Sequence, residues 1–136
     1  MRIISSDAHC SFEVSRETVG DYSSFSVSGS VDIGHGRFSG ENRDVHFLNL
    51  EQFVACLDSY ILDRSLMPTL NGTYDTNVKI WTPGGHRSTV MLTFAIGDAY
   101  AGTPVTAKYR LEGEFEIDQE MLNALLENFR ELANAV

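Results

Sequence analysis

The chain has 136 residues, of which 43% are hydrophobic and 21% charged, the composition of a single globular domain covering residues 1–136. Disordered and collagen-like chains are excluded. Ten Lys and Arg against 19 Asp and Glu give a net charge of −9 with neutral His, so we expect neither nucleic acid nor an anionic membrane as a partner.

The cysteine content and the first residues of the chain predict a cytoplasmic protein. Two cysteines, Cys10 and Cys56, are too few for a disulfide scaffold, and residues 1–10 have neither the charged start nor the apolar core of a signal peptide. The longest nearly apolar run, residues 90–96, is far shorter than the roughly 20 residues that a membrane span needs. We therefore expect no transmembrane segment.

The first third of the chain predicts a β-hairpin and one further strand. Apolar residues alternate with polar ones over residues 23–33, which is the period of a half-buried strand, and residues 10–15 show the same alternation. The Gly20–Ser23 segment supplies a turn between the two. Glycines at 34, 36 and 40 then separate the hairpin from a short strand expected at residues 45–48.

Capping signals and apolar stripes predict two helices. Asn49 stands three residues before Gln52, the signature of a capping box, and we expect a helix over residues 50–62. Asp118 is a natural N-cap for a second helix over residues 119–133. The apolar stripe of this second helix consists of Leu122, Leu125, Leu126, Phe129 and Leu132.

Residues 78–81 and 90–96 predict a hairpin, because apolar and polar residues alternate in both. A three-residue loop at Pro83–Gly85, with Gly85 in the left-handed conformation, would place Val78 opposite Val90. This register brings the apolar residues of the two strands to one side.

The longest alternating segment, residues 105–117, predicts a strand with one wet face and one dry face. A connection centred between Tyr100 and Ala101 would place Leu111 opposite Val90. Two separate turn assignments therefore agree on which residues face the core.

These elements predict an α+β fold made of a single antiparallel β-sheet with two helices packed on one face. Two amphipathic helices and a sheet with one dry side bury their apolar faces if both helices cover that side. We expect about five to seven strands. The other face of the sheet would be open to water and free to meet a partner.

The water-facing row of the sheet carries the residues that we expect to bind a partner. Under these registers Trp81 faces Arg87, Arg87 faces Glu114, and Thr89 faces Glu112. A Trp beside an Arg and surrounded by carboxylates has the composition of an interface anchor with a polar rim. The predicted partner-binding residues are Trp81, Arg87, Glu112 and Glu114. The alternative is that Trp81 covers a sheet edge and that Arg87 and Glu114 form an ordinary cross-strand pair.

No motif predicts a catalytic, cofactor-binding or metal-binding site. The four histidines, at positions 9, 35, 46 and 86, have no metal-ligand spacing, and no serine lies in a nucleophile elbow. Gly34-His35-Gly36 lacks the residues of a phosphate loop, although His35 could act as a flexible base or simply be a solvated loop residue. We expect a protein that is not an enzyme and holds no cofactor or metal.

Three motifs between residues 47 and 132 carry a resemblance to a known family. They are Phe47-Leu48-x-Leu50-x-x-Phe53-x-x-x-Leu57 before the glycine of Asn71-Gly72, Gly84-Gly85-His86-x-x-x-Val90-x-Leu92-x-Phe94, and Phe115-x-Ile117-Asp118-x-x-x-Leu122. With the order of elements, they make the chain similar to the WapI-type bacterial immunity proteins. The resemblance implies a non-enzymatic protein that binds and neutralises a toxin domain made by the same cell. A basic toxin would suit the acidic chain, and the amino-terminal third lies outside the resemblance.

Two alternatives come from other classes of protein. One is a homo-oligomer that pairs through the open sheet face. The other is a small-ligand-binding or enzymatic α+β domain that uses Tyr109 or His35 in a pocket between sheet and helices, which would require polar groups converging on the dry side.

Overall fold

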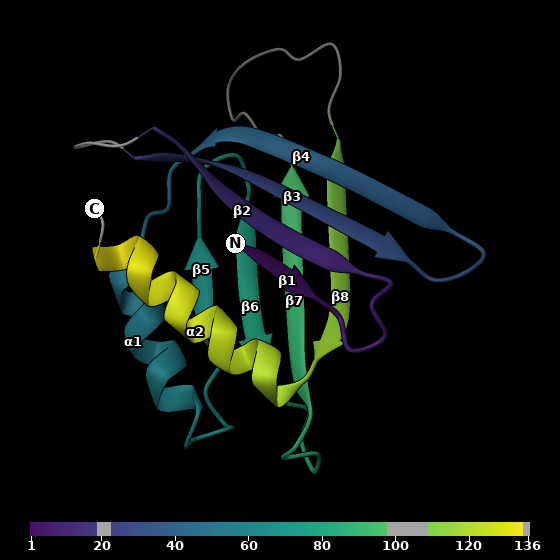
Figure 1. The fold of residues 1–136 in the computed structure, drawn as a ribbon, viewed down its shortest axis with the longest axis vertical. Helices are drawn as coiled ribbons and strands as arrows, with labels where there is room; N and C mark the ends of the chain where they lie inside the picture. The colour runs from purple at the N-terminus through teal and green to yellow at the C-terminus, as the bar shows by residue number, and fades with distance from the viewer. Residues whose placement is uncertain (19–22, 98–108, 135–136) are drawn as a thin grey trace.

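The computed structural model describes residues 1–18, 23–97 and 109–134, which form eight strands and two helices (Figure 1). In chain order the elements are β1 (Arg2–Ile4), β2 (Ser11–Thr18), β3 (Ser24–Asp32), β4 (Arg37–Val45), α1 (Leu50–Tyr60), β5 (Thr69–Asn71), β6 (Asn77–Trp81), β7 (Val90–Gly97), β8 (Arg110–Ile117) and α2 (Gln119–Asn134). The predicted classification as α+β is confirmed.

The prediction of a single sheet is wrong, because the strands form two separate antiparallel sheets. The first sheet has the order β1-β2-β3-β4 and the second has the order β5-β6-β7-β8. Along the chain, α1 lies between the strands of the first sheet and those of the second. An isolated bridge outside the named strands pairs Phe47 with Gly72. Buried apolar residues of both sheets share one core, so the apolar face of each sheet packs against the other.

The two sheets meet at the ring of Phe94 in β7. This fully buried ring lies 5.3 Å from the ring of Phe12 in β2 and 6.3 Å from that of Phe115 in β8, measured between centroids. It fits between the backbones of Gly29 in β3 and Gly113 in β8, where a Cβ at Gly113 would lie 2.5 Å from the Phe94 ring. Glycine is therefore required at both positions for the sheets to approach this closely.

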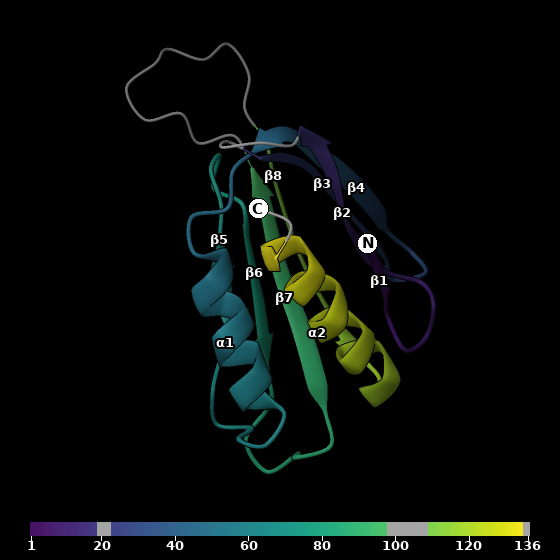
Figure 2. The ribbon, with the colours of Figure 1, turned by 60° about the vertical axis from the view of Figure 1, so that its left-hand side comes forward.

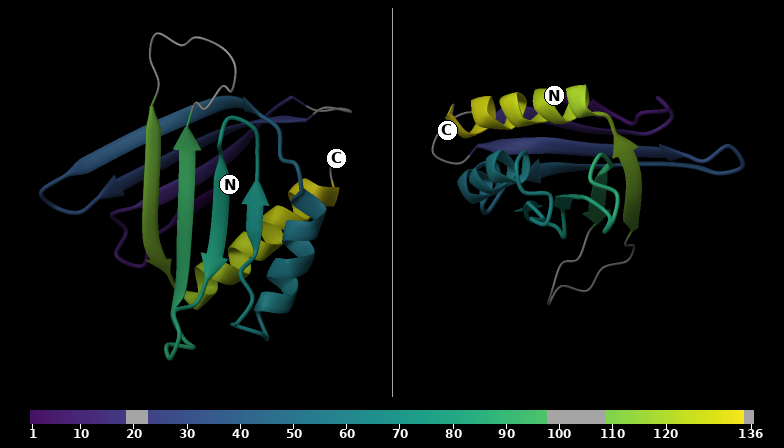
Figure 3. Two further views of the ribbon diagram at one scale, coloured as in Figure 1. Left: turned by 180° about the vertical axis from the view of Figure 1, so that it is seen from behind. Right: turned by 90° about the horizontal axis from the view of Figure 1, so that it is seen from below.

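The helices complete the core beside the crossing of the sheets. Figures 2 and 3 show α2 on the side of the second sheet that also carries the first sheet, and α1 beside β5 at the edge. The rings of Phe53 in α1 and Phe129 in α2 meet edge to face, with centroids 5.0 Å apart. No helix in the described ranges is long and apolar enough to cross a membrane.

The two predicted helix caps behave differently. Asp118 accepts a hydrogen bond from the Met121 N–H at 2.8 Å, so the N-cap of α2 is confirmed. The capping box at Asn49 is wrong, since its side chain makes no cap bond. That amide instead donates to Thr69 O at 2.9 Å and accepts from the Asn71 N–H at 2.8 Å. Asn49 therefore fastens α1 to β5.

The amino-terminal hairpin is confirmed by the antiparallel pairing of β2 with β3, although most of the predicted turn lies outside the described residues. The expected short strand at residues 45–48 is wrong, because β4 runs over Arg37–Val45. A turn at residues 33–36, with Gly34 at φ +91°, returns the chain to extended structure early. Gly40 lies inside β4 opposite Gly29 instead of interrupting it.

A buried amide also joins the two sheets. Asn42 in β4 donates to the carbonyl of Gly97 at the end of β7 and to the hydroxyl of Thr76, at 2.5 and 3.4 Å. Its side-chain oxygen accepts a hydrogen bond from the Tyr109 hydroxyl. The carbonyl and amino groups of the buried Asn42 side chain are thus both hydrogen-bonded.

Adding one methyl group at the crossing of the sheets should destabilise the fold. Gly113→Ala places a Cβ 2.5 Å from the ring of the fully buried Phe94 and 2.6 Å from Val31, so the packing must shift. We expect the free energy of unfolding to fall by about 1–3 kcal/mol in urea denaturation. Gly84→Ala is the matched control, because nothing lies within 4 Å of its added Cβ. Equal stability of the two variants would contradict the close approach.

Candidate interaction surface

The face of the second sheet turned away from the first sheet, called here the outer face, is left open by the described elements. Figure 3, in its left-hand view, shows β5–β8 in front with the first sheet and α2 behind them. Strand alternation places a mixed set of side chains on this face. They are Thr69, Asn71, Asn77, Lys79, Trp81, Met91, Thr93, Ala95, Arg110, Glu112, Glu114 and Glu116.

A chain of hydrogen bonds runs across the outer face from β6 to β8. The indole Nε1 of Trp81 donates to Thr93 Oγ1 at 2.8 Å, and that hydroxyl donates to Glu114 Oε1 at 2.8 Å. The polar edge of the indole is therefore satisfied within the sheet. The half-buried ring is held in place with part of its surface available to a partner.

The structure brings Trp81, Glu112 and Glu114 to the outer face as predicted, but it places Arg87 elsewhere. Arg87 is an exposed residue of the loop between β6 and β7, so it pairs with neither Trp81 nor Glu114. Trp81 lies opposite Met91 and Glu114 lies opposite Thr93. The predicted cross-strand neighbours of these side chains are therefore wrong.

Longer connections explain these register errors. In the β6–β7 loop the His86 N–H donates to Pro83 O and the Thr89 N–H donates to His86 O, which makes two successive turns where one was predicted. Gly85 is left-handed as predicted, at φ +83°. Val78 consequently pairs with Phe94, four residues beyond the expected Val90.

The register between β7 and β8 is displaced in the same manner. Leu111 pairs with Ile96, six residues beyond the expected Val90, and the turn predicted between β7 and β8 lies outside the described residues. The predicted part of this strand over residues 105–108 lies there too. Both displacements are even, so the described residues of β6, β7 and β8 keep the faces that their alternation predicted.

Two outer-face residues were missed by the sequence interpretation. Met91 is half-buried between Trp81 and Glu116, and it extends the apolar area around the indole. Thr93 links Trp81 to Glu114. Both lie at polar-face positions of the 90–96 alternation, so the outward parity of that strand was the signal that could have found them.

The carboxylates of β8 differ in how they are compensated. Arg110 binds Glu112 at 2.7 Å and also pairs with Asp75. The hydrogen bond to Glu112 is the main reason that the pKa of Arg110 is raised. Within the described residues, no Lys or Arg pairs with Glu114 or Glu116. The outer face therefore carries a negative strip along β8 that could receive cations.

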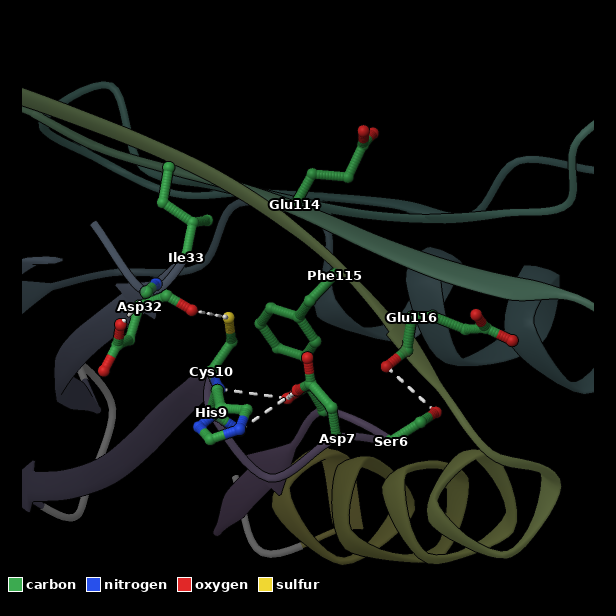
Figure 4. A pocket seen from close by; sticks show the side chains of 11 residues that line it. Ser6, Asp7, His9, Cys10, Asp32, Ile33, Glu114, Phe115 and Glu116 are labelled. Carbon is green, nitrogen blue, oxygen red and sulfur yellow. Dashed lines mark hydrogen bonds between the residues drawn. The ribbon is translucent and has the colours of Figure 1, made fainter. Parts of the chain in front are cut away.

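A groove of about 610 Å³ lies beside the edge of β8 that faces away from β7, under the turn between β3 and β4 (Figure 4). Its lining comes from three segments: residues 5–10, residues 32–34 and residues 114–116. Four of its lining residues are Asp or Glu, and none is Lys or Arg. Figure 4 shows the Glu114 carboxylate turned away from His9 and Cys10, so these polar groups do not converge.

Hydrogen bonds within the turn at residues 5–10 explain its shape. The Ser5 hydroxyl donates to Asp7 Oδ1 at 2.6 Å and accepts from the Cys10 N–H at 3.0 Å, while the His9 N–H donates to the same Asp7 oxygen. The bond from Ser5 lowers the pKa of Asp7, and the bond from His9 adds to it. Ser6 N–H extends the turn to β8 by donating to Glu116 O at 2.8 Å.

The residues considered for a pocket are not brought together. His35 is exposed at the turn between β3 and β4, while the Tyr109 hydroxyl donates to Glu41 O at 2.7 Å as well as reaching Asn42. Within the described parts of the chain, no three His, Cys, Asp or Glu side chains are grouped as metal ligands. Cys10 and Cys56 are both unpaired thiols.

Comparison of the chain with protein families, with curated proteins and with solved structures finds no match. The similarity to WapI-type immunity proteins therefore stays a prediction.

Removing the Ser5 hydroxyl should move the pKa of Asp7 toward its ordinary value of 3.8. A lowered carboxyl pKa stabilises the fold above the ordinary value, and this contribution is lost as the pH falls through the folded pKa. Titration of the Asp7 carboxyl by NMR should give a midpoint below 3.8 in the wild type and nearer 3.8 in Ser5→Ala. Ser6→Ala, whose hydroxyl contacts Glu116 O, should leave the midpoint unchanged. An unchanged midpoint in Ser5→Ala would contradict this assignment.

Proposed function

We propose that the chain is a non-enzymatic protein-binding domain that docks a basic partner protein on the outer face of the second sheet. The observation that carries this proposal is Trp81, whose ring lies on an open sheet face beside Met91 and the strip of carboxylates along β8. The similarity to immunity proteins supports a bacterial toxin domain as that partner, which the chain would neutralise by covering it.

The chemistry of the outer face fits a binding surface better than a catalytic one. Tryptophan is the residue most enriched among interface hot spots, and it contributes most when polar neighbours around it exclude water. Trp81 has this setting, because its indole nitrogen donates a hydrogen bond to Thr93, and Glu114 and Glu116 of β8 lie on the same face. A partner side chain would meet a fixed apolar ring within a polar rim.

The charge of the chain supports a basic partner. The net charge of −9 and the uncompensated Glu114 and Glu116 attract a positive surface over long range, which raises the association rate. A toxin that acts on nucleic acid carries such a surface, because it must contact phosphates. We place the encounter in the cytoplasm, where the unpaired cysteines would stay reduced.

The same charges act against pairing of two copies through this face. Face-to-face association would bring the Glu114 and Glu116 of one copy close to acidic residues of the other, and like charges in close contact are destabilising. A homo-oligomer is therefore an outcome that the binding experiments must exclude.

Trp81→Ala should weaken the partner complex by about 2 kcal/mol or more while the domain stays folded. The partner is isolated by pull-down from the source cells with the wild-type protein, and affinities are measured by calorimetry with circular dichroism as the folding control. Wild-type affinity in a folded Trp81→Ala variant would show that the outer face is not the binding surface.

Reversing the charges of β8 should chiefly slow association. Glu112→Lys with Glu114→Lys should reduce the association rate with the isolated partner, and the reduction should shrink as salt rises, since exposed charges are screened over about 8 Å at physiological ionic strength. Glu13→Lys with Glu131→Lys is the matched control, because both residues are exposed on other elements and the net charge changes equally. Equal slowing by both pairs would leave net charge as the cause and contradict a role for β8.

A further inference from the structure

The outer edge of β8 has the hydrogen-bonding groups of a strand that lacks a neighbour. β8 pairs with β7 on one side, and the described strands place nothing on the other. Ser6 N–H donates to Glu116 O, so the backbone groups of Glu116 point away from β7. Alternation makes those of Glu114 and Glu112 point the same way, and no described residue bonds to them.

The first sheet extends beyond this edge. Along β3, Gly29 packs on Phe94 of β7, and Val31 packs over Gly113 of β8. Ile33 follows Val31 by two residues of extended chain, which places it about 6.6 Å farther on. Neighbouring strands of a sheet are only about 4.8 Å apart. Ile33 therefore lies over the position that a strand next to β8 would take, and it is 63% exposed.

β4 repeats this progression one strand away. Asn42 bonds to Gly97 of β7, and Gly40 lies against Leu111 of β8. Phe38 comes next along the row, is paired with Val31 and is 69% exposed. Figure 1 shows the hairpin of β3 and β4 reaching past β8. Two large apolar side chains thus lie over a strand position that no described strand occupies, beside the edge of β8.

We propose that an extended segment of the basic partner adds to β8 as a fifth strand of the second sheet, beneath Ile33 and Phe38. Its backbone would pair with Glu112 and Glu114. Its inward side chains would be apolar and would contact Ile33 and Phe38. Its outward side chains would be Lys or Arg beside the carboxylates of β8. The basic character of this segment rests on the function proposed above.

Charge also decides between this occupant and a second copy of the chain. If two copies paired edge to edge through β8, Glu112, Glu114 and Glu116 would lie beside the same residues of the other copy, which is destabilising. A segment with alternating basic and apolar residues meets favourable neighbours on both faces. The groove at residues 114–116 leaves space for it as far as the Ser6 contact.

The test uses a capped peptide of alternating Lys and Val, with a peptide of alternating Glu and Val as its control. Amide hydrogen exchange is followed by NMR in the full chain. In the free protein the amides of Gly113 and Phe115, which point to β7, should exchange slowly and those of Glu112 and Glu114 rapidly. The Lys-Val peptide should slow exchange at Glu112 and Glu114 at least about tenfold.

Two substitutions separate the edge site from general apolar contact. Ile33→Ser with Phe38→Ser should weaken peptide binding about tenfold or more through loss of buried apolar area. Leu48→Ser with Leu62→Ser is the matched control, since these leucines are 69% and 94% exposed and lie before and after α1. Glu114→Pro, which removes one edge N–H, should weaken binding more than Glu114→Gln, which removes only the charge.

The following results would contradict the proposed peptide site at the edge of β8. Absence of slowed exchange, or equal binding by the Ile33/Phe38 and the Leu48/Leu62 variants, would exclude it, and equal binding of the Glu-Val peptide would exclude a basic occupant. Protected Glu112 and Glu114 amides in a free protein that sediments as a dimer would assign the edge to a second copy. The edge site is tested with the peptide and the outer face with the isolated partner and Trp81→Ala, so failure of one and failure of the other are distinguishable.

Discussion

The close contact of Phe94 with two glycines determines how the rest of the structure is arranged. Because Gly29 and Gly113 have no side chains, the first sheet can cross the second at the distance of one aromatic ring. That crossing leaves part of the dry face of the second sheet for α2 and α1. It also carries the hairpin of β3 and β4 past the edge of β8, where the exposed Ile33 and Phe38 lie.

The face that each strand residue occupies could be predicted, whereas its cross-strand partner could not. Alternation along a strand is a property of the backbone, so Trp81 and Glu114 reached the expected face even though their neighbours differ. Register depends on the connection, and the two turns around His86 displaced β7 by four residues. The division into two sheets was missed because separate hairpins give the same local pattern as neighbours in one sheet.

The candidate binding surface was therefore predicted in part. Three of its four expected residues share the outer face, while Arg87 lies in a loop that the assumed three-residue turn had placed within the strand pair. The strand edge of β8 could not have been predicted, because it depends on which strand is last in the sheet. Sequence alternation describes faces, and a free edge is a property of topology.

The buried amide of Asn42 fixes the position of the first sheet relative to the second. The fit of the Phe94 ring against Gly29 and Gly113 is steric, and a hydrogen bond adds a requirement of direction that apolar contact lacks. The amide of Asn42 reaches Gly97 O in one position only, and sliding the first sheet by one pleat would leave this buried group without a partner. A single polar side chain thus excludes a family of shifted packings, which keeps the overhang of β3 and β4 at a fixed place relative to β8.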